Sequence, residues 1–156
     1  MGRSVPCRID GLIARDAPKA VLFRRSPGKY CEMLSWDLRT DDVTPGQWIR
    51  ATVRTRLADL SPNGKYLIAA YSDHSIRRIR QSARYNLSEQ VGGCWTAISK
   101  PPYFTALALW FSTSWNGGGI WDSDTQVGLN NASYGLWQPA MELTPTAQVK
   151  SGSEQQ

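Results

Sequence analysis

Histidine and cysteine are scarce in this chain. Of its 156 residues, only His74 is a histidine, and the three cysteines, Cys7, Cys31 and Cys94, lie far apart. Structural zinc sites use about four cysteine or histidine ligands in closely spaced pairs, which this set does not supply. An odd number of dispersed cysteines is typical of free thiols in a reducing compartment. We therefore predict three unbridged cysteines, and neither a metal nor a cofactor.

Long hydrophobic runs are also missing. No segment approaches the roughly 18 apolar residues that a membrane-spanning helix needs. The first residues, Met1 to Pro6, lack the apolar centre of a secretory signal. Gly2 does not begin a myristoylation motif, because Pro6 stands where that motif requires Ser or Thr. We expect a cytoplasmic protein that does not contact a membrane.

Signatures of catalysis and of phosphate binding are weak. The three glycines at 117–119 are not followed by the Lys-Ser/Thr pair of a phosphate-binding loop, so they favour a close backbone approach. The acidic loop after Asp122 departs from a calcium-binding loop, with Val127 in place of the glycine and Ser133 in place of the glutamate. His74, without a second histidine, is more typical of an exposed loop than of a general base. The sequence therefore favours a non-catalytic protein over an enzyme.

What the chain does contain is a series of short apolar segments that alternate with turns. Residues 48–57 give the clearest strand pattern, because Ile49, Val53 and Leu57 fall on one face at a period of two. Residues 20–24 and 30–38 flank a Pro27-Gly28 turn and predict a hairpin. Further strands are expected at 8–14, 66–71, 95–99, 119–121 and 126–129, whereas 103–111 fits either a strand or a short buried helix.

These segments predict a mainly β fold, a meander or sandwich of short strands with one short helix at most. We expect a single β-rich domain over residues 1–142. From Leu143 onward the residues are small and polar, so residues 143–156 are predicted to be a disordered tail.

The strongest candidate binding segment is rich in arginine. Arg77, Arg78, Arg80 and Arg84 precede Tyr85, with no acidic residue among them. Arginine matches the geometry of phosphate and carboxylate groups, and tyrosine can stack on a base. The segment 73–93 is either a short helix or a loop. If it is helical, Ile76, Ile79 and Ala83 are expected to dock on the body, with Arg78 pointing outward. A solvated charged surface, a nucleic-acid contact and an acidic protein partner all remain open.

Tryptophan, of which there are seven, provides a second candidate. Trp110, Trp115 and Trp121 lie close to the three glycines and are a candidate aromatic contact surface. Packing of at least two of these rings in the core is the alternative.

Two segments resemble β-propeller blades of the WD40 type: the Asp59–Leu67 turn and strand, and the Glu32–Leu38 strand with its Trp-Asp end. No repeat of about 40 residues recurs, so a closed propeller is not expected. The run from Trp95 to Trp110, the following glycines and the Pro45–Trp48 segment resemble a family of uncharacterised bacterial proteins. That resemblance implies a bacterial cytosolic protein and no particular activity.

Together these features predict a non-catalytic accessory protein. It would bind a larger protein or nucleoprotein assembly through the Arg-rich segment and exposed aromatic residues. Direct nucleic-acid binding is one alternative. A hydrolase or nuclease with an unrecognised site of Asp, Arg and His74 is another.

Overall fold

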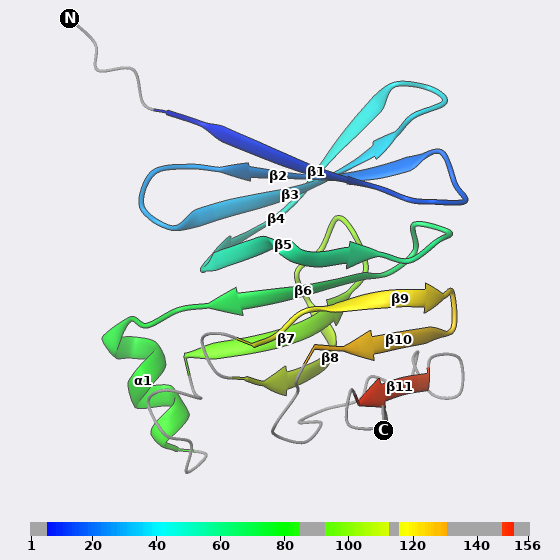
Figure 1. Ribbon diagram of the computed structural model, residues 1–156. Coiled ribbons are helices and arrows are strands. Elements are labelled where there is room, and N and C mark those ends of the chain that lie inside the picture. The colour runs from blue at the N-terminus through cyan, green and yellow to red at the C-terminus, as the bar shows by residue number, and fades with distance from the viewer. Residues whose placement is uncertain (1–5, 85–92, 113–115, 131–147, 152–156) are drawn as a thin grey trace, which may run out of the picture.

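The computed structural model describes residues 6–84, 93–112, 116–130 and 148–151, and these residues form eleven strands and one helix (Figure 1). The predicted mainly β fold is confirmed, and the described residues close neither a barrel nor a propeller. The elements are β1 (Arg8–Ile13), β2 (Lys19–Arg25), β3 (Tyr30–Asp37), β4 (Asp42–Arg50), β5 (Thr52–Leu60), β6 (Leu67–Ser72), α1 (Ile76–Ala83), β7 (Cys94–Ser99), β8 (Ala106–Phe111), β9 (Gly119–Ser123), β10 (Gln126–Leu129) and β11 (Gln148–Ser151).

The strands form three sheets in the order of the chain. The first sheet has the order β1-β2-β3-β4 and the middle sheet β5-β6-β7-β8, both antiparallel throughout. The third sheet has the order β11-β10-β9, with β10 antiparallel to β9 and parallel to β11. Within each sheet, consecutive strands are therefore neighbours, as in a meander.

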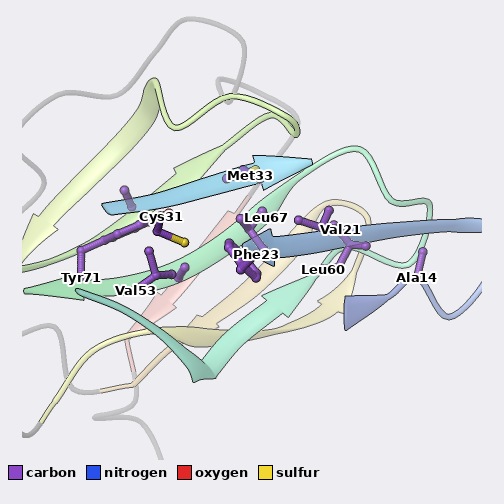
Figure 2. Close-up of a cluster of buried hydrophobic side chains, with 11 residues drawn as sticks. Ala14, Val21, Phe23, Cys31, Met33, Val53, Leu60, Leu67 and Tyr71 are labelled. Atoms are coloured by element: carbon purple, nitrogen blue, oxygen red, sulfur yellow. The ribbon is translucent and has the colours of Figure 1, made fainter. Parts of the chain in front are cut away.

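Two hydrophobic cores lie between the sheets. The first core joins side chains of the first sheet, such as Phe23 and Met33, to side chains of the middle sheet, such as Leu67 and Tyr71 (Figure 2). The second core joins Ile68, Ile98 and Trp110 of the middle sheet to Trp121, Val127 and Leu129 of the third. The middle sheet is thus covered on both faces.

The amino-acid sequence of strand β6 reflects the position of this strand between two cores. All six of its residues are buried. Leu67, Ala69 and Tyr71 pack into the first core, and Ile68 into the second. A strand that is covered on both faces needs apolar residues at successive positions, so Leu-Ile-Ala-Ala-Tyr shows no alternation.

The predicted strand over residues 48–57 is divided in the structure. Strand β4 ends at Arg50 and β5 begins at Thr52, so the chain passes from the first sheet to the middle sheet at the buried Ala51. Ile49 and Val53 both contact the first core, on either side of this bend. Because the two strands share one core, their side-chain pattern continues through the bend and does not reveal it.

A short strand lies near the C-terminal end. Residues 148–151, part of the predicted disordered tail, form β11 against the edge of β10, with Val127 opposite Val149. An edge strand offers unpaired backbone groups with which a further segment can pair. The other residues of the predicted tail lie outside the described part of the chain.

Candidate functional site

The Arg-rich segment forms helix α1, and a serine caps its start. The Ser75 hydroxyl accepts a hydrogen bond from the Arg78 backbone N–H at 3.3 Å. The Asp73 carboxylate in turn accepts hydrogen bonds from the Ser75 backbone N–H at 3.0 Å and from its hydroxyl at 3.1 Å. Serine in this position is a preferred N-cap, because its oxygen satisfies a backbone donor that the helix cannot pair.

Arg78 anchors α1 to the body of the protein. Its guanidinium carbon lies 4.6 Å from the centre of the Trp95 ring and 6.0 Å from that of Phe111. Ile76 is 69% exposed and Ala83 is also exposed. The prediction that Ile76, Ile79 and Ala83 dock while Arg78 points outward is therefore wrong for Ile76, Ala83 and Arg78, whereas Ile79 is half-buried. An arginine packs its long apolar stem and its flat cation on aromatic rings, which a pattern of apolar residues does not detect.

The remaining arginines of the segment point to solvent. Arg77, Arg80 and Arg84, together with Gln81, line a recess of about 390 Å³. All four residues are exposed, and within the described part of the chain no carboxylate forms an ion pair with these arginines. Tyr85, the last residue of the predicted site, lies outside the described residues. The helix thus presents three positive charges on one recess.

His74 and Cys94 form a contact that sequence reasoning missed. The His74 Nε2 atom lies 3.7 Å from the Cys94 Sγ atom, although the residues are 20 positions apart. Burial raises the pKa of the Cys94 thiol. A catalytic cysteine requires the opposite shift, toward the thiolate. The pair therefore lacks the electrostatics of a cysteine nucleophile, and His74 is exposed as expected.

The three glycines at 117–119 allow a close approach between backbones, as the sequence predicts. A Cβ atom added to Gly118 would lie 1.8 Å from the Leu57 carbonyl oxygen. The Gly118 backbone N–H also donates to the Thr96 hydroxyl at 2.7 Å. Through these contacts, the segment that precedes β9 packs directly on the middle sheet.

A recess of about 710 Å³ lies beside these glycines, between β5 and β9. Two of its charged residues already hold β9 in place. The Asp59 carboxylate accepts a hydrogen bond from the Trp121 backbone N–H at 2.7 Å, and Arg15 donates to the Trp121 carbonyl at 2.8 Å. These groups therefore have a structural role.

The turn between β9 and β10 also uses its acidic residue for structure. The Asp124 carboxylate accepts a hydrogen bond from the Asn63 backbone N–H at 2.8 Å. Among the described residues, no group of three or more His, Cys, Asp or Glu side chains is placed to hold a metal ion.

Two of the three tryptophans of the second candidate are buried and do not lie on the surface. Trp110 is 5% exposed, and Trp121 is fully buried and stacks on Tyr66. Both rings therefore pack in the second core, which was the alternative interpretation of their position. Trp115 lies outside the described residues.

Two of the three exposed aromatic residues in the described part of the chain lie elsewhere, on the first sheet, and the third is Tyr103. Trp48 is 49% exposed with the Arg24 guanidinium 5.3 Å from its ring, and Tyr30 is 46% exposed with Arg50 at 5.9 Å. Trp48 and Arg50 alternate with apolar residues along β4, and this alternation is the signal in the sequence that indicates such a surface.

In comparisons with known proteins, no family model, no curated protein and no solved structure matches the chain. The resemblance to uncharacterised bacterial proteins stays a prediction. None of the helices in the described part of the chain is long and apolar enough to cross a membrane.

Proposed function

We propose that this chain is a non-catalytic accessory protein that binds a larger protein or nucleoprotein assembly, with helix α1 as its contact for an anionic surface. The observation that carries the proposal is the recess formed by Arg77, Arg80 and Arg84 on the exposed side of a helix that Arg78 holds in place. Guanidinium groups bind phosphate and carboxylate groups through paired hydrogen bonds.

The energetic cost of this arrangement supports a binding role. Like charges one helical turn apart repel each other, as Arg77 and Arg80 do here, and no acidic residue lies in the first turn to offset them. Such a cluster does not improve the stability of an isolated helix. An anionic partner would compensate these charges.

The arginines of α1 have two different roles, and the test has to separate them. Arg78 contacts Trp95 and belongs to the attachment of the helix, so it should be kept. Replacing Arg77, Arg80 and Arg84 with glutamine removes the charges that face solvent and leaves the anchor intact. The matched control replaces Arg8, Arg39 and Arg56, three exposed arginines outside the helix, and changes the net charge by the same amount.

The test is affinity purification of the three tagged proteins from the cells that express the chain naturally, with and without nuclease. The R77Q/R80Q/R84Q variant should lose the partner that wild type retains, and the R8Q/R39Q/R56Q control should keep it. Loss of the partner on nuclease treatment would assign the contact to nucleic acid. Retention of the partner by the helix variant would overturn the proposal.

A direct titration with a short single-stranded RNA distinguishes nucleic acid from an acidic protein. If the helix binds phosphates, the slope of log K against log salt should flatten by about 0.7 for each phosphate that the helix variant no longer binds. An RNA affinity that is low and equal in all three proteins would instead leave an acidic protein as the partner.

A further inference from the structure

The recess on α1 offers almost only hydrogen-bond donors. The described residues that line it are three arginines and one glutamine, Arg77, Arg80, Gln81 and Arg84. A guanidinium group donates hydrogen bonds and accepts none, and the glutamine amide adds further donors and a single acceptor oxygen. Among these described lining residues there is neither a carboxylate nor an apolar side chain. The recess therefore fits a ligand that carries negative charge and many acceptor atoms.

The spacing of the lining residues sets the shape of this ligand. Arg80 and Gln81 follow Arg77 by three and four positions within α1, so the three side chains lie on one side of the helix. Arg84 comes directly after α1, and its backbone N–H donates to the Gln81 carbonyl at 3.3 Å. At about 1.5 Å per residue, the three arginines extend over about 10 Å. They form a row, which matches an elongated polyanion better than a single small anion.

The helix that carries this row is attached to the body of the protein before any ligand binds. Ser75 caps its first turn, and Arg78 packs on Trp95, with 4.6 Å between the guanidinium carbon and the ring centre. Figure 1 shows α1 beyond the end of β6, at the periphery of the molecule. An ordered helix lowers the entropic cost of binding, and its peripheral position leaves room for a long ligand.

Nucleic acids and acidic protein segments both carry rows of negative charge, and the lining of the recess favours the nucleic acid. A contact between proteins buries apolar area as well, about half of the interface or more. Ile76 is exposed on the first turn of α1 but is not among the described residues that line the recess. Contacts with nucleic acid are more polar and more cationic than contacts between proteins. The formal net charge of the chain, +5, has the sign that attracts a polyanion.

We propose, on the basis of the anionic contact already proposed for α1, that its ligand is the phosphate backbone of a nucleic acid. Guanidinium and phosphate groups pair through two parallel hydrogen bonds. Along one strand of a duplex, successive phosphates are about 3.4 Å apart along the axis, so a row of about 10 Å faces about three of them. DNA and RNA present the same phosphate chemistry, and the experiment has to separate these two sources.

The test is a fluorescence-anisotropy titration of the full chain with a labelled duplex DNA and a labelled single-stranded RNA, each of about 20 nucleotides, from about 50 mM to about 300 mM salt. In the R77Q/R80Q/R84Q variant, the slope of log K against log salt should flatten by about 2.7 on the duplex or about 2 on the single strand, because about three phosphate contacts are lost. The nucleic acid that shows this change is the source of the phosphates. The R8Q/R39Q/R56Q control should keep most of the wild-type slope.

Two further measurements separate phosphates from the carboxylates of a protein. Unlabelled polyglutamate of the same total charge should displace the nucleic acid at least about tenfold less effectively, because its carboxylates lie on flexible side chains that have to be ordered. Ile76→Gln removes the exposed apolar side chain of the first turn and keeps a good helix former at that position. This variant should bind the nucleic acid like wild type, whereas a protein partner that buries Ile76 would bind it more weakly.

Four results would overturn the proposal: a wild type that binds neither nucleic acid, a helix variant with the wild-type slope, polyglutamate that competes as well as nucleic acid, or an Ile76→Gln variant as weak as the helix variant. The two proposals about α1 fail in different ways. A native partner that the helix variant loses, and that nuclease does not remove, would keep the anionic contact and reject nucleic acid as its ligand. A native partner that the helix variant retains would reject the anionic contact itself.

Discussion

The first and the middle sheet have the same four-stranded antiparallel order, but they differ in how many of their faces are covered. In the middle sheet, β6 has six buried residues in succession. In the first sheet, β2 places Val21 and Phe23 in the core, whereas Leu22 is half-buried and Arg24 is exposed. The pattern of burial along a strand thus follows the number of covered faces. The outer face of the first sheet nevertheless carries apolar side chains, although it is exposed.

The strongest test of this comparison replaces one isoleucine in each sheet. Ile68 is fully buried in the second core, and Ile9 is 64% exposed on the first sheet. Ile68→Ala should lower the free energy of unfolding by about 2–5 kcal/mol through reduced burial and a residual cavity. Ile9→Ala should change it by less than about 0.5 kcal/mol. Urea unfolding measures both. Equal reductions would mean that the outer face of the first sheet is already covered in the monomer.

A second prediction concerns the joint between the middle and third sheets. Gly118 and Gly28 both have positive φ, of 75° and 86°, so alanine at either position carries the same kind of backbone strain. Only at Gly118 would the new Cβ meet a neighbour, the Leu57 carbonyl oxygen. Gly118→Ala should therefore cost about 1–3 kcal/mol more than Gly28→Ala, by analogy with overpacked cores. Thermal unfolding of the two variants gives this difference. A similar cost at both sites would show that the third sheet shifts without penalty.

The smallest expected effect appears at alkaline pH. Cys31 lies on the covered face of the first sheet, where burial raises the pKa of its thiol to about 11 from an ordinary value of 9.0, an effect partly offset by Arg25. Between these two pH values the unfolded chain loses the thiol proton while the folded protein keeps it. The stability is therefore unaffected by this thiol below pH 9 and should fall as the pH rises, by at most about 1.4 kcal/mol per pH unit.

The control for this prediction is the exposed cysteine. The loss of stability between about pH 9 and about pH 10.5 should be smaller in the Cys31→Ala variant than in wild type. In the Cys7→Ala variant this loss should be the same as in wild type. Burial also raises the pKa of Tyr71, so part of the alkaline slope should remain in the Cys31 variant. A Cys31→Ala protein with the full wild-type slope would contradict the assignment to this thiol.

Much of the local structure could be predicted from the sequence because it depends on a few neighbouring residues. The Pro27-Gly28 turn is present, with Gly28 and Lys29 at positive φ, and it joins β2 to β3 as a hairpin. The Asn63-Gly64 turn is present as well, with Gly64 at a φ of 73° and its Cβ position close to Lys19. Turn geometry follows from the φ angles that each residue tolerates, so it is read directly from residue type.

The candidate site was predicted less completely. The sequence correctly indicated four arginines on a segment that can form a helix, but its pattern assigned Arg78 to solvent and Ile76 to the body. The interaction that reverses these roles is made with Trp95 and Phe111, which lie on β7 and β8. No spacing within 76–84 carries information about those rings, because they come from another part of the chain.

The sequence by itself determined where most strands and turns form, that the fold is mainly β, and where positive charge is concentrated. These properties depend on the backbone preferences and side-chain alternation of short segments. Only the tertiary structure decided which faces are covered: that Trp110 and Trp121 are buried, that residues 48–57 divide between two sheets, and that Trp48 and Tyr30 lie on an open surface. Alternation marks the two faces of a strand without identifying what packs against each. That choice is made when distant segments meet.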